Sequence, residues 1–316
     1  PSPCRGGKLS SPPVRGRLRG GRNNTRLFFR NGTKNLYNTI MENVNTEIVI
    51  RPTSGFSTLH LHELWEYREL IYFLVWRDIK VKYKQTFFGA AWAIFRPLMA
   101  MVIFTFVFNK LAGFTSEGVP YVVFTMCGIV AWNFFAEGVG GASQSLLINA
   151  NLITKVYFPR IIIPFAAILS GVLDFLIALI MLMLMMMWFH CSPSAQILFF
   201  PLFFGIGVVT SLGLGLWFSS LSVQYRDVAH ALPFFIQLLF WISPVGYSST
   251  RVPEMWQIVY WINPMTCVIE GYRWSLLHTG TLPISLAAVS LVSCIIIFIT
   301  GVMQFLRTQQ KFADVI

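Results

Sequence analysis

The sequence predicts an all-α membrane protein with six transmembrane helices, and three observations support this fold class. Hydrophobic residues make up 55% of the chain and charged residues only 12%, a balance that is not typical of soluble domains. The apolar residues occur in blocks long enough to cross a hydrocarbon core of ~30 Å. Basic residues between the blocks collect on one side, which predicts an orientation for the chain.

Residues 1–40 supply most of the positive charge. They contain nine lysines and arginines and no acidic residue, whereas the formal net charge of the whole chain is +11. Because they are rich in Pro, Gly, Arg and Asn and lack apolar periodicity, we expect a disordered basic extension. One interpretation is an arm that binds anionic lipid or nucleic acid. The other, which we favour, is a non-native extension before a start at Met41, without a nucleic-acid partner.

Residues 41–87 are predicted to be a cytoplasmic N-terminal segment that contains an amphipathic helix from His60 onwards. Apolar residues recur there at spacings of three and four, and charged residues lie mostly opposite them. Aromatic rings and cations of this kind favour the headgroup level of a membrane. The side chains expected at this interface are Trp65, Tyr72, Trp76 and Arg77.

Residues 88–316 form the predicted transmembrane domain. Its six apolar segments are 88–112, 119–142, 163–189, 196–220, 229–248 and 283–306. A tight turn at 190–195 makes the third and fourth segments an antiparallel hairpin. Most lysines and arginines outside the first 40 residues fall on the side of the N-terminus, so both termini are predicted to be cytoplasmic.

Residues 249–282 differ from the six spans. They contain two short helical stretches that are broken at Asn263-Pro264, and Pro253 and Pro264 stand where the two stretches begin. Each stretch is too short to cross a bilayer. The segment is either a re-entrant hairpin in the outer leaflet, which we favour, or an external amphipathic loop.

Sequence motifs for catalysis are missing. The chain has no GxxxxGK[ST], HExxH or GxSxG pattern, so we expect a transport subunit rather than an enzyme, with no nucleotide site of its own. Five cysteines without a CxxC spacing indicate neither a zinc site nor a disulfide framework. We expect no bound metal. Cys191 and Cys267 share the external side, where a bridge between them is a minor alternative.

Charges within the spans are candidate functional groups. Asp174 lies near the middle of the third span, where it either touches a hydrophilic path or ties two helices together. Glu137 and Arg96 lie near the cytoplasmic ends of their spans, which an interfacial position explains. No series of acidic residues at regular depth indicates a proton relay.

Aromatic residues are frequent in three of the spans. Such rings either pack between helices or line a conduit, where their faces can stack on the C–H faces of sugars. The channel-lining candidates are Phe104, Phe108, Trp132, Phe135, Phe234, Phe240 and Trp241. The small-residue run Gly213–Leu221 predicts close helix packing instead.

Four motifs in this order resemble the membrane subunit of ABC-2-type exporters of polysaccharides, which move lipid-linked O-antigen, teichoic acid or capsule. The motifs are RDIKVKYKQTFFGAAWAIFRPL, NLITKVYFPRIIIP, SVQYRDV and WINPMTCVIEGYR. The resemblance runs from about Leu61 to the C-terminus. Arg96 departs from the acidic or neutral residue usual beside the proline of the first span.

The resemblance implies a multi-pass homodimer in the bacterial inner membrane, with two copies of a separate ATPase subunit that binds ATP and Mg²⁺. Spans one and five of both subunits would frame the channel, and residues 253–277 would form the outer gate. The residues implied to couple to the ATPase are Asn151, Leu152, Lys155, Tyr157, Phe158 and Arg160. The gate candidates are Trp256, Tyr260, Trp261, Pro264, Glu270 and Arg273. The alternatives are an ABC-2 exporter of drugs or small lipids and an ion-coupled secondary transporter.

Overall fold

The structure is a computed structural model that describes residues 65–84, 91–116, 118–193, 195–279 and 282–309. Within these ranges it contains helices and no strand, which confirms the all-α prediction. The predictions for residues 1–64 lie outside the described residues, except that the amphipathic helix continues beyond them.

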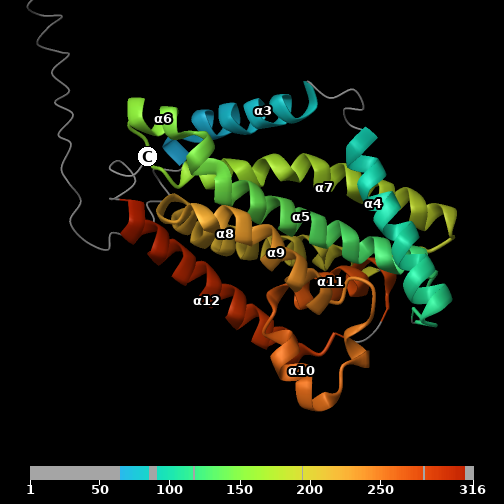
Figure 1. The fold of residues 1–316 in the computed structure, drawn as a ribbon. Coiled ribbons are helices and arrows are strands. Elements are labelled where there is room, and N and C mark those ends of the chain that lie inside the picture. Colours follow the sequence, from blue (N-terminus) through green and yellow to red (C-terminus); the bar gives the residue numbers. More distant parts are fainter. Residues whose placement is uncertain (1–64, 85–90, 117, 194, 280–281, 310–316) are drawn as a thin grey trace, which may run out of the picture. The chain divides into compact units, whose positions relative to one another are not determined.

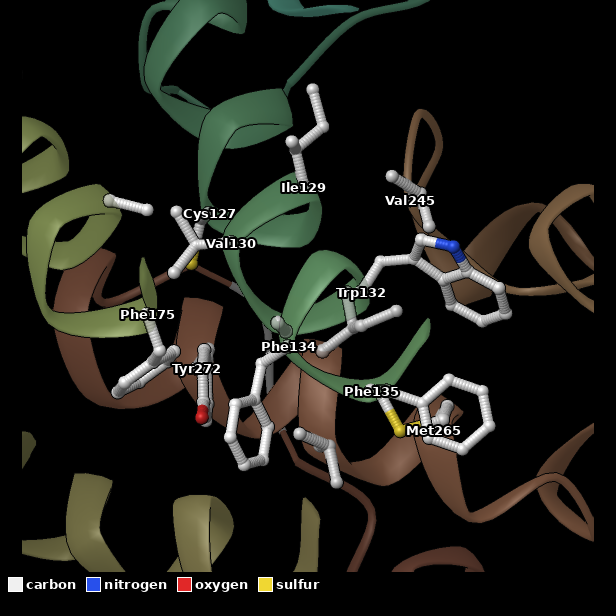
Figure 2. Close-up of a cluster of buried hydrophobic side chains, with 14 of the residues drawn as sticks. Cys127, Ile129, Val130, Trp132, Phe134, Phe135, Phe175, Val245, Met265 and Tyr272 are labelled. Atoms are coloured by element: carbon white, nitrogen blue, oxygen red, sulfur yellow. The ribbon is translucent and has the colours of Figure 1, made fainter. Parts of the chain in front are cut away.

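Helix α5 (Tyr121–Ile148) is the centre of the fold. It packs against α7 (Ile162–Trp188), α8 (Phe200–Gln224) and α11 (Pro264–Leu277), and Figure 1 shows it between α7 and α8. In its most apolar stretch 78% of the residues are buried, against 17–33% in the other helices of membrane-spanning length. The apolar core therefore surrounds α5, as the side chains in Figure 2 show.

Helix α12 (Ile284–Thr308) packs along α8, and two glycines allow their close approach. A Cβ on Gly301 would lie 2.2 Å from the carbonyl oxygen of Gly213, and a Cβ on Gly213 would lie 2.8 Å from Cα of Phe298. Both neighbours are backbone atoms that no side-chain rotation can move. The prediction that the glycine-rich run serves helix packing is confirmed.

The first membrane helix changes its winding near its end. Helix α4 (Ala91–Phe104) continues into a seven-residue π-helix, Thr105–Leu111. Wider turns of this kind are rare and occur often at functional sites. Phe108 lies in the π-helix and follows Phe104 by four residues, and the centroids of the two rings are 5.1 Å apart.

Helix α9 (Arg226–Ile242) ends six residues before the predicted end of the fifth span, so the boundary at 248 is wrong. Ser243 is extended because Pro244 follows it, and residues 243–248 turn back into the core. With 17 residues α9 is ~25 Å long, shorter than the five helices whose length and composition suit a membrane span. The structure thus supports five of the six spans by this criterion.

The five longer helices match the predicted segments, with shifted ends: 91–111, 121–148, 162–188, 195–224 and 284–308. The largest shift is at α5, which extends six residues beyond the predicted 142. Ser143, Ser145 and Leu146 are buried there, so tertiary packing continues the helix beyond its most apolar part.

The segment between α9 and α12 forms two short helices, as predicted. Helix α10 (Glu254–Trp261) follows Pro253, and α11 begins at Pro264 with the Asn263 side chain accepting a hydrogen bond from the Met265 amide at 3.1 Å. The break at Asn263-Pro264 is therefore confirmed. Cys191 and Cys267 are free thiols, so the alternative of a disulfide bridge between them is wrong.

Helix α3 (Arg68–Lys84) is the described part of the predicted interface helix. It packs along α7, with Leu74 buried in the contact. The predicted interfacial rings Trp65, Tyr72 and Trp76 are exposed on α3 or just before it. The Arg77 guanidinium pairs with the neighbouring Asp78 carboxylate at 2.7 Å.

Candidate functional site

Four charged side chains meet where the end of α3 reaches α4, α5 and α7. The Lys82 ammonium lies 2.6 Å from an Asp174 oxygen on α7 and 2.9 Å from a Glu137 oxygen on α5. Arg96 on α4 approaches the other Glu137 oxygen at 3.6 Å. Lys82 thus joins three helices, and Asp174 forms the tie between helices that was one of its two sequence interpretations. We call these four residues the inner polar cluster.

Lys82 and the neighbouring Tyr83 both have raised pKa values. Burial lowers the pKa of Lys82, but hydrogen bonds from its ammonium to Asp174 and Glu137 outweigh this effect and raise the pKa above 10.5. The Tyr83 hydroxyl donates to Asp174, and burial together with this bond raises the pKa of Tyr83. Lys82 is therefore charged and Tyr83 neutral at physiological pH.

A cavity of about 380 Å³ lies beside the inner polar cluster, between α3, α4, α5 and α7. Its wall combines the four charged residues with the Tyr83 hydroxyl and the Asn133 amide. Its aromatic lining consists of Trp92, Phe134 and Phe175. Asp174 therefore borders a cavity whose lining joins polar and aromatic groups. Its second sequence interpretation, contact with a hydrophilic path, stays a prediction.

Six of the seven predicted channel-lining rings form one continuous network. Phe104 stands in its middle, with ring centroids 5.1 Å from Phe108, 5.5 Å from Phe240 and 6.3 Å from Trp241. Phe240 in turn lies 5.4 Å from Trp132, which is 5.2 Å from Phe135. The network therefore spans from α4 through α9 to α5. The structure describes Phe234 outside it, as an exposed ring on α9.

The rings of this network differ in burial. Trp132 and Phe135 on α5 are only 4% and 1% exposed, and Figure 2 shows Trp132 pointing toward Val245. Trp241 on α9 is 56% exposed. Within one subunit the α5 rings are core residues and Trp241 faces outward, whereas Phe104, Phe108 and Phe240 are half-buried.

The predicted coupling residues separate in the same way. Helix α6 (Ala150–Lys155) directly follows α5. Asn151, Lys155 and Tyr157 are exposed, and Leu152 is half-buried. Phe158 is buried, and a guanidinium N–H of Arg160 donates to the Gln309 carbonyl after α12. Phe158 and Arg160 therefore anchor the segment, and its outward surface comes from the other residues.

Arg273 on α11, in the predicted outer gate, is buried and holds neighbouring backbone in place. Its side chain is 1% exposed and lies over the Phe124 ring, 3.6 Å from the centroid. It donates to the carbonyl oxygens of Val245 at 2.8 Å and Tyr247 at 3.1 Å, and lies 3.4 Å from Glu270. These bonds hold the turn after α9 against α5 and α11.

The remaining gate candidates lie around this turn at different depths. Trp261 and Pro264 are buried, and Trp256 is exposed. The Tyr260 hydroxyl donates to the Tyr247 hydroxyl at 3.2 Å, and burial, the first of several causes, raises the pKa of Tyr260. Glu270 accepts a hydrogen bond from the Ser249 amide at 2.8 Å, so both members of the Glu270–Arg273 pair bind the same turn.

The sequence profile of the ABC-2 type transporter family matches residues 69–277 of this chain. The chain belongs to the ABC-2 type transporter family. The match to this ABC-2 family runs from α3 to the end of α11, and so contains the inner polar cluster, α6 and the Arg273 turn.

Several relatives of this ABC-2 protein are polysaccharide transport proteins by name. The O-antigen export system permease protein RfbA of Klebsiella pneumoniae is 26% identical over 249 residues, which cover 78% of this chain and 95% of that protein. The protein of the same name from Myxococcus xanthus is 26% identical, over 73% and 91% of the two chains. The polysialic acid transport protein KpsM of Escherichia coli is 22% identical, over 62% and 77%.

Sequence reasoning did not assemble the inner polar cluster of this ABC-2 chain. It treated Lys82 as a topology signal, Glu137 and Arg96 as interfacial charges, and it did not single out Asn133. A signal was present, because Glu137 and Asp174 are acidic residues within predicted spans and several cations precede the first span. Among the described residues, no group of three histidine, cysteine or acidic side chains could hold a metal ion.

Proposed function

We propose that this chain is the permease subunit of an ATP-driven exporter that moves a lipid-linked polysaccharide across the bacterial inner membrane. The observation that carries the proposal is the ring network between α4 and α9, whose outward part exposes Trp241. Flat aromatic faces bind the C–H surfaces of successive sugars without fixing one register, which suits a moving chain. The names of the relatives support the same substrate class.

A homodimer would enclose the path. Helices α4 and α9 expose large apolar side chains that include Phe95, Val102 and Ile103 on the first and Phe235 and Leu238 on the second. A second copy that packs on these faces would place the outward rings of both subunits around one conduit, with a self-complementary two-fold interface. Phe234 would join the lining in that arrangement.

Energy would enter through a separate ATPase subunit, two copies of which bind ATP and Mg²⁺. The exposed surface of Asn151, Lys155 and Tyr157 on and after α6 is the contact that we assign to it, with Leu152 at its edge. Because α6 directly follows α5, a shift of α6 would act on the central helix of the subunit.

In the membrane, α9 would act as the fifth of six spans together with the turn that follows it, so that both termini are cytoplasmic. Helix α3 would lie at the inner surface with its exposed rings among headgroups. Helices α10 and α11 would form the re-entrant hairpin and outer gate, fixed to the bundle through Arg273 and Glu270.

The test reconstitutes the chain with its ATPase in vesicles and measures ATP-dependent export of lipid-linked glycans. Trp241→Ala should lower export several-fold with little change in unfolding temperature, because Trp241 is half exposed. The matched variant Trp132→Ala should instead lower stability by about 3–5 kcal/mol, because that ring is in the core. Export without ATP would support an ion-coupled carrier and sink the proposal. Transport of drugs or small lipids with no glycan transport would support the other ABC-2 class.

A further inference from the structure

The cavity between α3, α4, α5 and α7 has a composition that the ring network does not explain. We propose that it is a saccharide-binding site within each subunit, separate from the conduit between subunits. The inference rests on the proposed function in its choice of ligand class. Its volume of about 380 Å³ lies within the usual range for small-molecule sites.

The Asn133 amide is a group in the cavity that a ligand could bind. It lies on the central helix α5 and lines the cavity, and within the described residues its amide makes no hydrogen bond. The Asn133 side chain is half-buried, so a molecule in the cavity can reach its amide. An amide both donates and accepts, so a hydroxyl group is a suitable partner for it.

The charges of the inner polar cluster select among ligand classes. Two cations, Lys82 and Arg96, stand against two anions, Glu137 and Asp174, so the formal charges in the cavity cancel. A phosphate or carboxylate would meet both acidic side chains, and a cationic ligand would meet Lys82 and Arg96. A neutral ligand with many hydroxyl groups can bond to both kinds without adding a charge.

The aromatic lining supplies the second half of a sugar site. Trp92 on α4 is 51% exposed beside the polar groups, and Phe134 and Phe175 form a buried apolar floor. Sugars present hydroxyl edges and C–H faces, which match this division of the lining. The Arg96 and Lys82 side chains are 65% and 49% exposed, so the charged side of the cavity opens to the surface of the subunit.

The test measures protection of a cysteine placed in the lining, with the full chain in nanodiscs and without the ATPase. Ala93→Cys provides the thiol, and Cys4 and Cys191 are replaced by serine. The rate of N-ethylmaleimide labelling is followed while the methyl glycosides of glucose, galactose, mannose and N-acetylglucosamine are titrated in turn. At about ten times its dissociation constant a bound glycoside should slow labelling about tenfold. Ser285→Cys, at the exposed start of α12, should label at an unchanged rate.

Asn133→Leu separates binding from a structural role. Because the amide has no protein partner in the described part, its removal should leave the unfolding temperature unchanged or higher, yet abolish the protection. Loss of stability with intact protection would overturn the assignment of Asn133. Protection by inorganic phosphate at equal ionic strength, or by no glycoside, would overturn the saccharide site.

The outcome is independent of the export assay. Protection by a glycoside in a chain that exports no glycan would keep the cavity assignment and reject the proposed function. Glycan export by a chain without protection would do the reverse.

Discussion

The two charge clusters of the subunit contrast in burial and in partners. In the turn after α9, Arg273 is 1% exposed and donates mainly to backbone carbonyls. At the inner polar cluster, Lys82 is 49% exposed and, among the described residues, bonds carboxylates on two different helices beside a cavity. Arg273 thus bonds mainly backbone acceptors that cannot move and is enclosed by protein. Lys82 bonds side-chain acceptors that can move, and a cavity lies beside it.

This contrast separates a structural role from a binding role. Backbone acceptors cannot turn away, so Arg273 fixes the turn after α9, and a buried charge that loses its partner is strongly destabilising. Side-chain acceptors can exchange one donor for another at small cost when water is near. We therefore expect substitutions at Arg273 to act on folding, and those in the inner polar cluster to act more on ligand binding.

Arg273→Met should have the largest effect on stability. It removes the bonds to Val245 and Tyr247 and leaves Glu270, 15% exposed, without its cation, which should cost about 3–5 kcal/mol. Thermal unfolding of the purified protein in detergent measures the change. The control is Arg251→Met, which removes an exposed guanidinium from the same outer region and should change stability by less than about 1 kcal/mol. If the two variants lost the same stability, the buried Arg273 would not have the structural role that we assign to it.

Asp174→Asn should have an intermediate effect. It keeps the shape and an acceptor for Tyr83 but removes the charge opposite Lys82, which should cost about 1–2 kcal/mol because Lys82 is half exposed. The same unfolding measurement applies. Asp78→Asn, which removes a carboxylate whose partner in the described part of the chain is the neighbouring Arg77, should cost less than about 0.5 kcal/mol. A larger loss from Asp78→Asn would contradict the assignment of Asp174 as the tie between α3 and α7.

Alkaline pH should give the smallest effect and a test of direction. The pKa values of Lys82 and Tyr83 are raised above 10.5 and 10.0, so the folded state holds these protons more tightly than the unfolded state does. The resulting stability is complete below about pH 10 and is lost as the pH rises through the folded values. Unfolding temperatures between pH 8 and 11 should show the gap between the native protein and Asp174→Asn narrowing above pH 10. If the difference in unfolding temperature widened above pH 10 instead, the expected direction of the pH dependence would be wrong.

The long helices were predictable because their determinants are local. Apolar length predicted 163–189 and 283–306, and the structure places helices at Ile162–Trp188 and Ile284–Thr308. The hairpin break was also readable from Asn263-Pro264, since an N-cap residue followed by proline is a local pattern that favours a helix start. The end of α9 also had a local signal, because Pro244 disfavours a helical Ser243, but the prediction did not use it. The path of the turn after it was not readable, because Arg273 holds that turn from 28 residues beyond Val245.

The sequence predicted many residues of the candidate site but not the role of each. The sequence supplied most of the residue types, but whether a ring packs or lines a path depends on burial, which differs between Trp132 and Trp241 within one network. Likewise, Arg160 and Lys155 look equivalent in sequence, and only the contact with Gln309 makes Arg160 an anchor.

By itself the sequence determined that this chain is a helical membrane protein and where its apolar helices run, because helix formation and membrane insertion depend on residues that are close in the chain. Only the tertiary structure decided that Lys82 meets Asp174 across 92 positions, that Asn133 lines a cavity, and that Arg273 is buried. The physical reason is that charges and rings act over a few ångströms of space, and the packing of distant helices on α5 sets those distances.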